Sequence, residues 1–154
     1  MALLAALETW GPVAAIRASP MLYAALNALH IIGLGILVGA ILTLDLRVLG
    51  IWKADGWREA VSVSSPIAAA GLLLALSTGC LLFLMRPGHY LGNPPFLAKL
   101  GLVGFGLLNA ALFHWRLRQS SGPEAGPMLR TFALMSVVTW MAAIFAGRFI
   151  AFVF

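Results

Sequence analysis

The chain has 154 residues, of which 62% are hydrophobic and only 10% are charged, and its net charge at pH 7 is +5. A soluble domain would carry about a quarter charged residues, so the composition excludes a soluble enzyme or binding domain and predicts a membrane protein. The basic residues lie mainly between the apolar segments, where they signal membrane topology, and nucleic acid is excluded as a partner. The single cysteine, Cys80, excludes an internal disulfide.

The first twenty residues do not have the pattern of a signal peptide, because no basic segment precedes the apolar residues and Glu8 interrupts them. Apolar side chains instead recur at helical spacing, at Leu3, Leu4, Leu7 and Trp10. We expect a short helix over about residues 2–16 that lies in the membrane interface, interrupted at Gly11 and Pro12.

Four apolar segments follow, each longer than the roughly 20 helical residues that cross a bilayer. Ser19 and Asn93 are placed to cap the first and third segments, and a proline follows each of them directly. The predicted spans cover residues 20–49, 61–85, 94–115 and 128–154. Short polar connections favour an all-α, up-down-up-down four-helix bundle within a single transmembrane domain.

Basic residues are more frequent beside the first and third connections than at the opposite ends of the spans. Because cytoplasmic connections carry an excess of Lys and Arg, both termini are predicted to lie outside the cytoplasm.

The ionisable residues of the spans fall into two layers. At 1.5 Å per helical residue, His30 lies about 15 Å, Lys99 about 8 Å and Arg148 about 9 Å from the outer ends of their helices. Three others fall near the cytoplasmic ends: Asp45, His114 and Arg130. Half a membrane thickness separates His30 from His114, so the pair is not expected to ligate one metal ion.

At 100° per residue, the polar residues of three spans each share one helix face, which is predicted to point into the bundle. These faces are Asn27, His30 and Asp45 on the first span, Lys99, Gly106 and His114 on the third, and Arg130, Met141 and Arg148 on the fourth. Asp45 is expected to form an ion-pair group with Arg47 and Arg130 at the cytoplasmic rim.

An ionisable residue inside a span indicates a functional site by default. His30 can be an axial haem ligand, a copper ligand, a proton carrier, or a histidine hydrogen-bonded to a neighbouring helix. Lys99 and Arg148 have no acid in the outer half to pair with, so a haem propionate, a quinone oxygen or a lipid phosphate would complement them. Alternatively, both side chains extend to the headgroups.

Three segments together resemble a family of small bacterial four-helix membrane proteins without an assigned function. They read LHIIGLGILVGAILTLDLR, YLGNPPFLAKLGLVGFGLLNAALFH and AGRFIAF. More distantly, the layout is similar to HemJ-type protoporphyrinogen oxidases and to the membrane domain of CopD-type copper-resistance proteins. The HemJ-type resemblance implies a haem b held by a first-helix histidine and a later lysine, positions that His30 and Lys99 would occupy.

The leading hypothesis is a multi-pass protein of the bacterial inner membrane, with periplasmic termini, that binds haem b and exchanges electrons, with quinone as one partner. His30 is the predicted axial ligand, and Lys99 and Arg148 are predicted to hold the propionates. Met141 and His89 are the candidates for a second ligand, and a haem without a second ligand is the alternative. The alternative is a non-catalytic accessory or assembly subunit, which packs against a partner or its own copies as a homo-oligomer. Copper handling is the third hypothesis. Between an enzyme and a non-catalytic protein the sequence does not decide.

Overall fold

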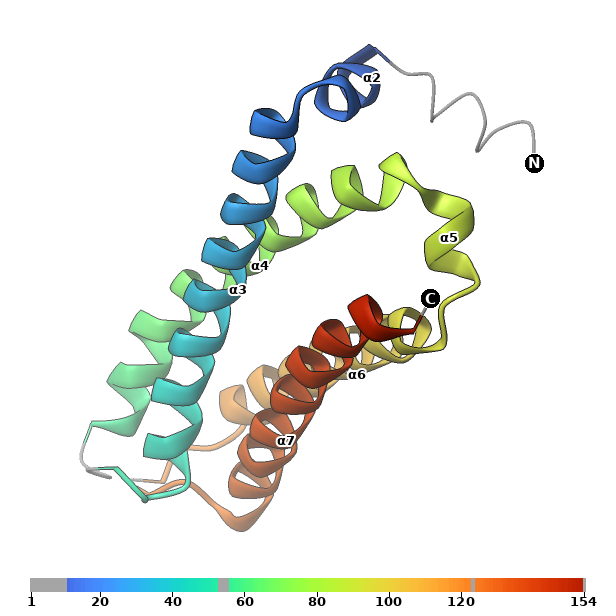
Figure 1. Ribbon diagram of the computed structural model, residues 1–154. Helices are drawn as coiled ribbons and strands as arrows, with labels where there is room; N and C mark the ends of the chain where they lie inside the picture. The colour runs from blue at the N-terminus through green and yellow to red at the C-terminus, as the bar shows by residue number, and fades with distance from the viewer. Residues whose placement is uncertain (1–10, 53–55, 123, 154) are drawn as a thin grey trace.

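The computed structural model describes residues 11–52, 56–122 and 124–153, and the elements in this part of the chain are all helical. Four long helices run antiparallel in succession, which confirms the predicted all-α four-helix membrane bundle (Figure 1). They are α3 (Pro20–Val48), α4 (Trp57–Met85), α6 (Pro94–Arg118) and α7 (Pro127–Phe149). Three short elements accompany them: α2 (Gly11–Ala18), α5 (Pro87–Leu91) and the 3-10 turn η1 (Ile150–Phe152).

The observed helices differ from the predicted spans mainly at their ends. α4 begins at Trp57 rather than near Val61, because the Trp57 side chain is buried among other apolar residues and packing extends the helix by a turn. Pro12 lies in the first turn of α2, where its missing N–H is no loss, so residues from Gly11 onward are helical. The part of the predicted interfacial helix before Gly11 lies outside the described residues.

Side-chain caps fix where α3 and α6 begin, and both predicted N-caps are confirmed. The Leu22 N–H donates to the Ser19 hydroxyl at 3.4 Å, and the Phe96 N–H donates to the Asn93 side-chain oxygen at 3.1 Å. The Asn93 amide nitrogen also donates to the carbonyls of Ile150 at 3.3 Å and Val153 at 2.8 Å. One asparagine therefore starts α6 and ties the segment after α7 to it.

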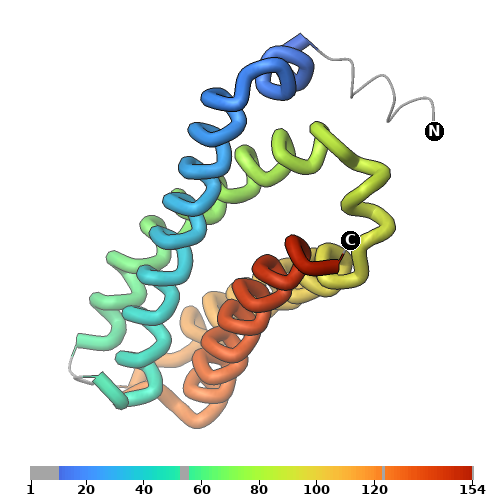
Figure 2. The backbone as a smooth tube through the Cα atoms, in the orientation of Figure 1, coloured from blue at the N-terminus to red at the C-terminus, as the bar shows by residue number. Residues whose placement is uncertain are grey.

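The bundle consists of two helical hairpins, α3–α4 and α6–α7, and contacts between α3 and α7 join them. The hairpins converge at the end that carries the connections 49–56 and 119–126, here called the loop end. They spread apart toward the opposite end, which carries α2, α5 and η1 and is here called the terminal end (Figure 1, Figure 2).

Two glycines bring α3 and α4 into backbone contact. A Cβ atom added at Gly33 would lie 2.8 Å from the Ala75 nitrogen, and one added at Gly71 would lie 2.5 Å from the Leu37 nitrogen. Since real Cβ atoms do not approach so closely, the absence of a side chain at both positions is what lets these helices touch.

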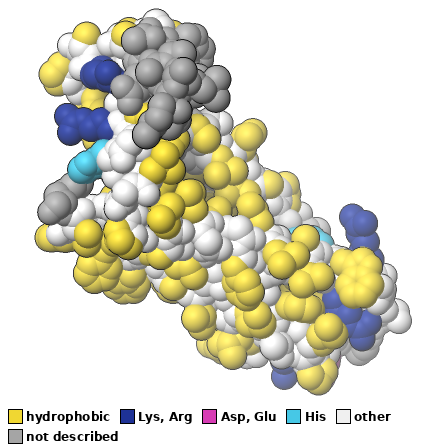
Figure 3. Space-filling model, turned by 90° about the vertical axis from the view of Figure 1, so that its right-hand side faces the viewer, with side chains coloured by type: hydrophobic (Ala, Val, Ile, Leu, Met, Phe, Trp, Pro, Cys, Tyr) yellow, Lys and Arg dark blue, Asp and Glu magenta, His cyan; other side chains and the backbone are white. Residues whose placement is uncertain are grey.

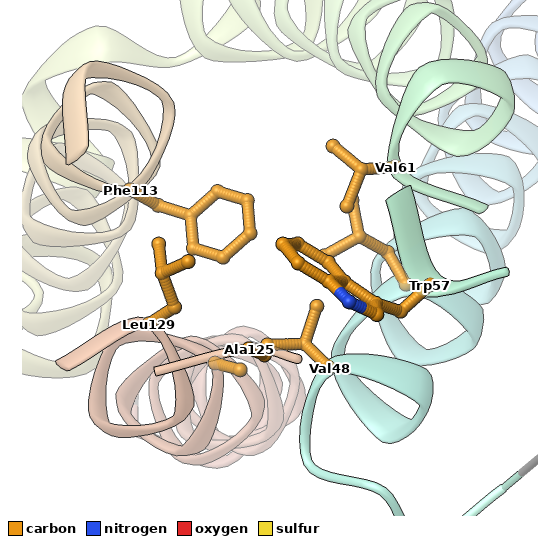
Figure 4. Close-up of a cluster of buried hydrophobic side chains, with 8 residues drawn as sticks. Val48, Trp57, Val61, Phe113, Ala125 and Leu129 are labelled. Carbon is orange, nitrogen blue, oxygen red and sulfur yellow. The ribbon is translucent and has the colours of Figure 1, made fainter. Parts of the chain in front are cut away.

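A buried apolar cluster closes the loop end. It is formed by side chains from all four long helices and from the 119–126 connection: Leu44, Val48, Trp57, Val61, Phe113, Ala125, Leu129 and Ala133. Figure 4 shows the larger members pointing toward one another between the helices. The cluster at the terminal end is smaller and joins only α2, α3 and α4, through Val13, Leu26 and Met85.

The outer surface of the bundle is apolar along the length of its helices. All four long helices meet the length and hydropathy required to cross a membrane, and large hydrophobic side chains are exposed on each of them. On the face drawn in Figure 3, hydrophobic side chains cover the middle of the molecule and Lys and Arg side chains gather toward its two ends. The chain is therefore a multi-pass membrane protein whose exposed apolar surface faces lipid.

Candidate functional sites in the two halves of the bundle

His30 lies on α3 against the neighbouring helix α4. Its ring nitrogen Nδ1 is 2.9 Å from the Ala75 carbonyl oxygen and 3.0 Å from the Thr78 hydroxyl oxygen. A carbonyl oxygen only accepts, and the Thr78 hydroxyl already donates to the Leu74 carbonyl at 2.6 Å, so Nδ1 is the donor in both contacts. In the neutral imidazole this leaves the lone pair on Nε2, which is the atom that would bind a metal.

Gly79 provides the space that the His30 ring occupies. A Cβ atom at Gly79 would lie 3.0 Å from His30 Cε1 and 4.0 Å from Nε2. Any larger residue at this position would therefore push the ring. Sequence reasoning missed Ala75, Thr78 and Gly79 as partners of His30, because no pattern within α4 marks the face that meets this histidine.

Lys99 is the residue predicted to share a membrane layer with His30. Its positive charge acts electrostatically on His30. The Lys99 side chain lies beside Gly147 on α7, where an added Cβ atom would be 3.5 Å from the Lys99 ammonium nitrogen. Arg148 follows Gly147 on α7 but is exposed, with its guanidinium 4.9 Å from the centre of the Phe152 ring. Lys99 thus lies inside the bundle, and Arg148 at its surface.

The two candidate second ligands occupy different places. Met141 is half-buried on α7, one of the helices that joins the hairpins. His89 is exposed in α5 at the terminal end, where it lines a surface pocket with Arg17, Met85 and Arg86. Arg17 donates to the Met85 carbonyl at 2.6 Å, which fastens α2 to the end of α4.

Copper handling, the third hypothesis, would need a group of metal-binding side chains. Within residues 11–52, 56–122 and 124–153, no three side chains of the His, Cys, Asp and Glu types come together in a way that could hold a metal ion. Cys80 is exposed on α4, and Met21 is exposed near the start of α3, whereas Met85 is buried.

Asp45 is the most deeply buried charged residue of the described chain, with 2% of its surface exposed. The expected ion pairs with Arg47 and Arg130 are absent, and this prediction was wrong. Arg47 is two residues from Asp45 on α3, so the two side chains leave the helix on opposite sides, and Arg130 instead lies 4.0 Å from Glu124. The Ser136 side chain on α7 faces the Asp45 carboxyl group.

His114 and Ser65 form a second polar contact near the loop end. His114 Nδ1 donates to the Ala110 carbonyl at 2.8 Å, so Nε2 accepts from the Ser65 hydroxyl at 3.0 Å. His114 therefore meets α4 at Ser65, whereas His30 meets it at Thr78, about 20 Å away at the helical rise per residue. The prediction that the two histidines cannot bind one ion is consistent with this separation.

The predicted inward-facing polar stripes are only partly correct. Asn27, Arg130 and Arg148 are exposed, although the helical wheel placed them on the faces that point into the bundle. Arg130 and Arg148 lie close to the two ends of α7, where long basic side chains reach the headgroup region without needing the bundle interior.

A cavity of about 190 Å³ lies between the four long helices, on the terminal side of the loop-end cluster. Its polar lining consists of Asp45, Ser65, Asn109, His114 and Ser136. Sequence reasoning assigned Asp45 to a structural role and did not consider Ser65 or Ser136. These residues come from all four long helices, so they meet only when the whole bundle is packed.

Comparison of the chain with protein-family profiles, with curated proteins and with solved structures finds no match.

Proposed function

We propose that the chain is a b-type haem-binding electron-transfer protein of the bacterial inner membrane, with both termini in the periplasm and quinone as an exchange partner. The observation that carries the proposal is the hydrogen bonding of His30. Its Nδ1 donates to a backbone carbonyl of α4, and this arrangement fixes the tautomer and orientation that an axial histidine needs.

The residues around His30 support a haem held by this histidine. Nε2 of His30 would be the ligand atom, and the Ala75 carbonyl and Thr78 hydroxyl hold the ring against α4. Lys99 supplies a positive charge in the same layer, which would neutralise a propionate, and Arg148 supplies a second charge at the surface of α7. Haem bound here supplies a one-electron couple inside the membrane.

A spectrum of the purified protein tests the proposal. Protein produced with ample haem supply and purified in detergent should show a Soret band, a sharp α band after reduction with dithionite, and close to one haem per chain by pyridine extraction. A colourless protein would overturn the proposal.

Two histidine variants locate the site. His30→Ala should remove the haem while the protein stays inserted and monodisperse, because Nε2 of His30 is the ligand. His114→Ala is the matched control, since both nitrogens of His114 already have protein partners, and it should retain full haem content. Haem retained by His30→Ala would show that this assignment is incorrect.

A third variant tests the positioning of the ring. Gly79→Val should displace His30, because its Cβ would lie within 3.0 Å of His30 Cε1. We expect a shifted Soret band or reduced haem content. Gly101→Val, where a Cβ would have no neighbour within 4 Å, should leave the spectrum unchanged.

Topology is tested separately by cysteine accessibility. In a Cys80→Ser background, Arg118→Cys should react with an impermeant maleimide only after the cytoplasmic side is opened, and Gly88→Cys should react in intact spheroplasts. Labelling of Arg118→Cys from the periplasm would reverse the proposed orientation.

A further inference from the structure

The cavity between the four helices is a candidate site separate from the proposed haem site. Asp45 and Ser65 are carried by α3 and α4, and Asn109 and Ser136 by α6 and α7. The loop-end cluster lies below the cavity and shares Leu44 and Phe113 with its wall. The cavity therefore lies beside the cluster that joins both hairpins.

Two buried oxygen atoms in this wall have no hydrogen-bond partner. They are Oδ2 of Asp45 and Oδ1 of Asn109, on residues that are only 2% and 4% exposed. The Asn109 amide nitrogen donates to the Phe132 carbonyl at 3.0 Å, which fixes the amide with its oxygen as the unused atom. Since most buried polar atoms in proteins are hydrogen-bonded, two orphan acceptors in one cavity indicate a missing donor.

The other polar groups in the wall do not supply that donor. The Ser65 hydroxyl donates to His114 Nε2, and His114 Nδ1 donates to the Ala110 carbonyl, so both hydrogens are used. The Ser136 side chain interacts with the Asp45 carboxyl group, but Oδ2 of Asp45 still has no hydrogen-bond partner. Within the described residues no basic side chain lies within 4.0 Å of an Asp45 carboxylate oxygen.

The balance of charge and shape identifies the class of ligand. A buried carboxylate without a partner is strongly disfavoured, and a cation that also donates hydrogen bonds removes this penalty. The rest of the lining is apolar and aromatic, with Leu37, Ile41, Leu72, Phe113, Phe132 and Trp140. Aromatic faces attract organic cations, whereas one carboxylate in an apolar wall is a poor cage for a metal ion.

We propose that the cavity binds a small organic ammonium ion, with its N–H groups on Asp45 and Asn109 and its alkyl part against the apolar wall. The cavity volume of about 190 Å³ is below the roughly 300–1,000 Å³ of sites for drug-sized molecules, so the ligand is a primary amine with a short alkyl chain.

Isothermal titration of the full-length protein in nanodiscs tests this with n-butylammonium chloride as the probe. Saturable binding is expected for n-butylammonium, and binding at least tenfold weaker is expected for 1-butanol, which has similar shape but no charge. Absence of saturable binding would overturn the proposal. Equal binding of 1-butanol would show that the cavity binds apolar molecules irrespective of charge. Competition by NaCl would show a metal-cation site. Either result rejects the ammonium assignment.

Asp45→Asn is the central variant, because it keeps the shape of the side chain and removes its charge. We expect at least a tenfold loss of n-butylammonium affinity, together with a higher melting temperature in the absence of ligand, since an unpaired buried charge has been removed. Glu59→Gln, at an exposed acid of α4, is the matched control and should bind as the unmodified protein does. Undiminished binding by Asp45→Asn would refute the proposed site.

A blocking variant keeps the proposal testable if Asp45→Asn does not fold. Ala68→Phe fills the cavity from α4 without altering a polar group, whereas Ala70→Phe adds the same ring at an exposed position of the same helix that does not line the cavity. Binding should be lost in Ala68→Phe and retained in Ala70→Phe. The same affinity in both variants would place the ligand elsewhere and reject the cavity.

Discussion

The two buried clusters of the bundle join different numbers of helices. The loop-end cluster takes side chains from α3, α4, α6 and α7, whereas the terminal-end cluster takes them only from α2, α3 and α4. Both hairpins are therefore held together at one end of the molecule, and at the other end the α3–α4 hairpin packs against α2 instead. This difference explains why a cavity lined by all four long helices lies close to the loop end.

The polar groups of the two halves differ in the same way. His30, in the terminal half, finds its partners within its own hairpin, on α4. Asp45 and Asn109, near the loop end, lie between hairpins, and each retains an oxygen without a partner. Ser65 on α4 and His114 on α6 do form a hydrogen bond between hairpins, so the unsatisfied oxygens are specific to Asp45 and Asn109.

The largest expected effect on stability comes from Leu129, which is 1% exposed in the loop-end cluster. Leu129→Ala should lower the free energy of unfolding by about 2–5 kcal/mol, because it leaves a void in the cluster that joins the hairpins. Unfolding by a denaturing detergent, followed by circular dichroism, measures the loss. Spin labels on α4 and α6 should also report a broader distribution of distances between hairpins.

Leu26→Ala, in the terminal-end cluster, is the control for this comparison. It should also destabilise the protein, but the distances between hairpins should stay unchanged, because Leu26 contacts only the α2–α3–α4 group. Equal broadening in both variants would contradict the conclusion that the loop end alone joins the hairpins.

A smaller effect is expected from Gly71, which tests the contact within the first hairpin. Gly71→Ala should lower the free energy of unfolding by about 1–3 kcal/mol, because the added Cβ would lie 2.5 Å from the Leu37 backbone nitrogen and force the helices apart. Detergent unfolding measures this against Gly35→Ala, whose Cβ would have no neighbour within 4 Å. If Gly71→Ala left the free energy of unfolding unchanged, α3 and α4 would be more loosely packed than described.

The smallest effect concerns the caps. Asn93→Ala should lower the free energy of unfolding by about 0.5–2 kcal/mol, because the α6 cap is lost. It should also release the segment after α7, to which the Asn93 amide nitrogen donates two hydrogen bonds. Hydrogen exchange should rise at the start of α6 and around residues 150–153. Ser19→Ala removes only a cap, so exchange should rise at the start of α3 alone, and faster exchange at 150–153 in that variant would contradict the assignment.

The sequence predicted the features that depend on neighbouring residues. Hydropathy located the spans, and Ser19 and Asn93 were recognised as caps because a cap acts on the next three residues. The layers of His30 and Lys99 followed from helical rise alone. The environment of Asp45 could not be predicted in this way, because a helical wheel gives the face on which a residue lies but not the helix that covers that face. The cavity combines Ser65, Asn109 and Ser136 from three helices, and no local pattern links them.

The glycine contact between α3 and α4 also limits how this molecule can move. At Gly33 and Gly71 the two backbones approach so closely that an added Cβ atom would lie less than 3.0 Å from a main-chain atom of the other helix. We therefore expect the α3–α4 hairpin to act as a fixed frame and the α6–α7 hairpin to swing as a rigid body about the loop-end cluster. A hinge motion of this kind, with its pivot beside Val48 and Leu129, would change the width of the central cavity.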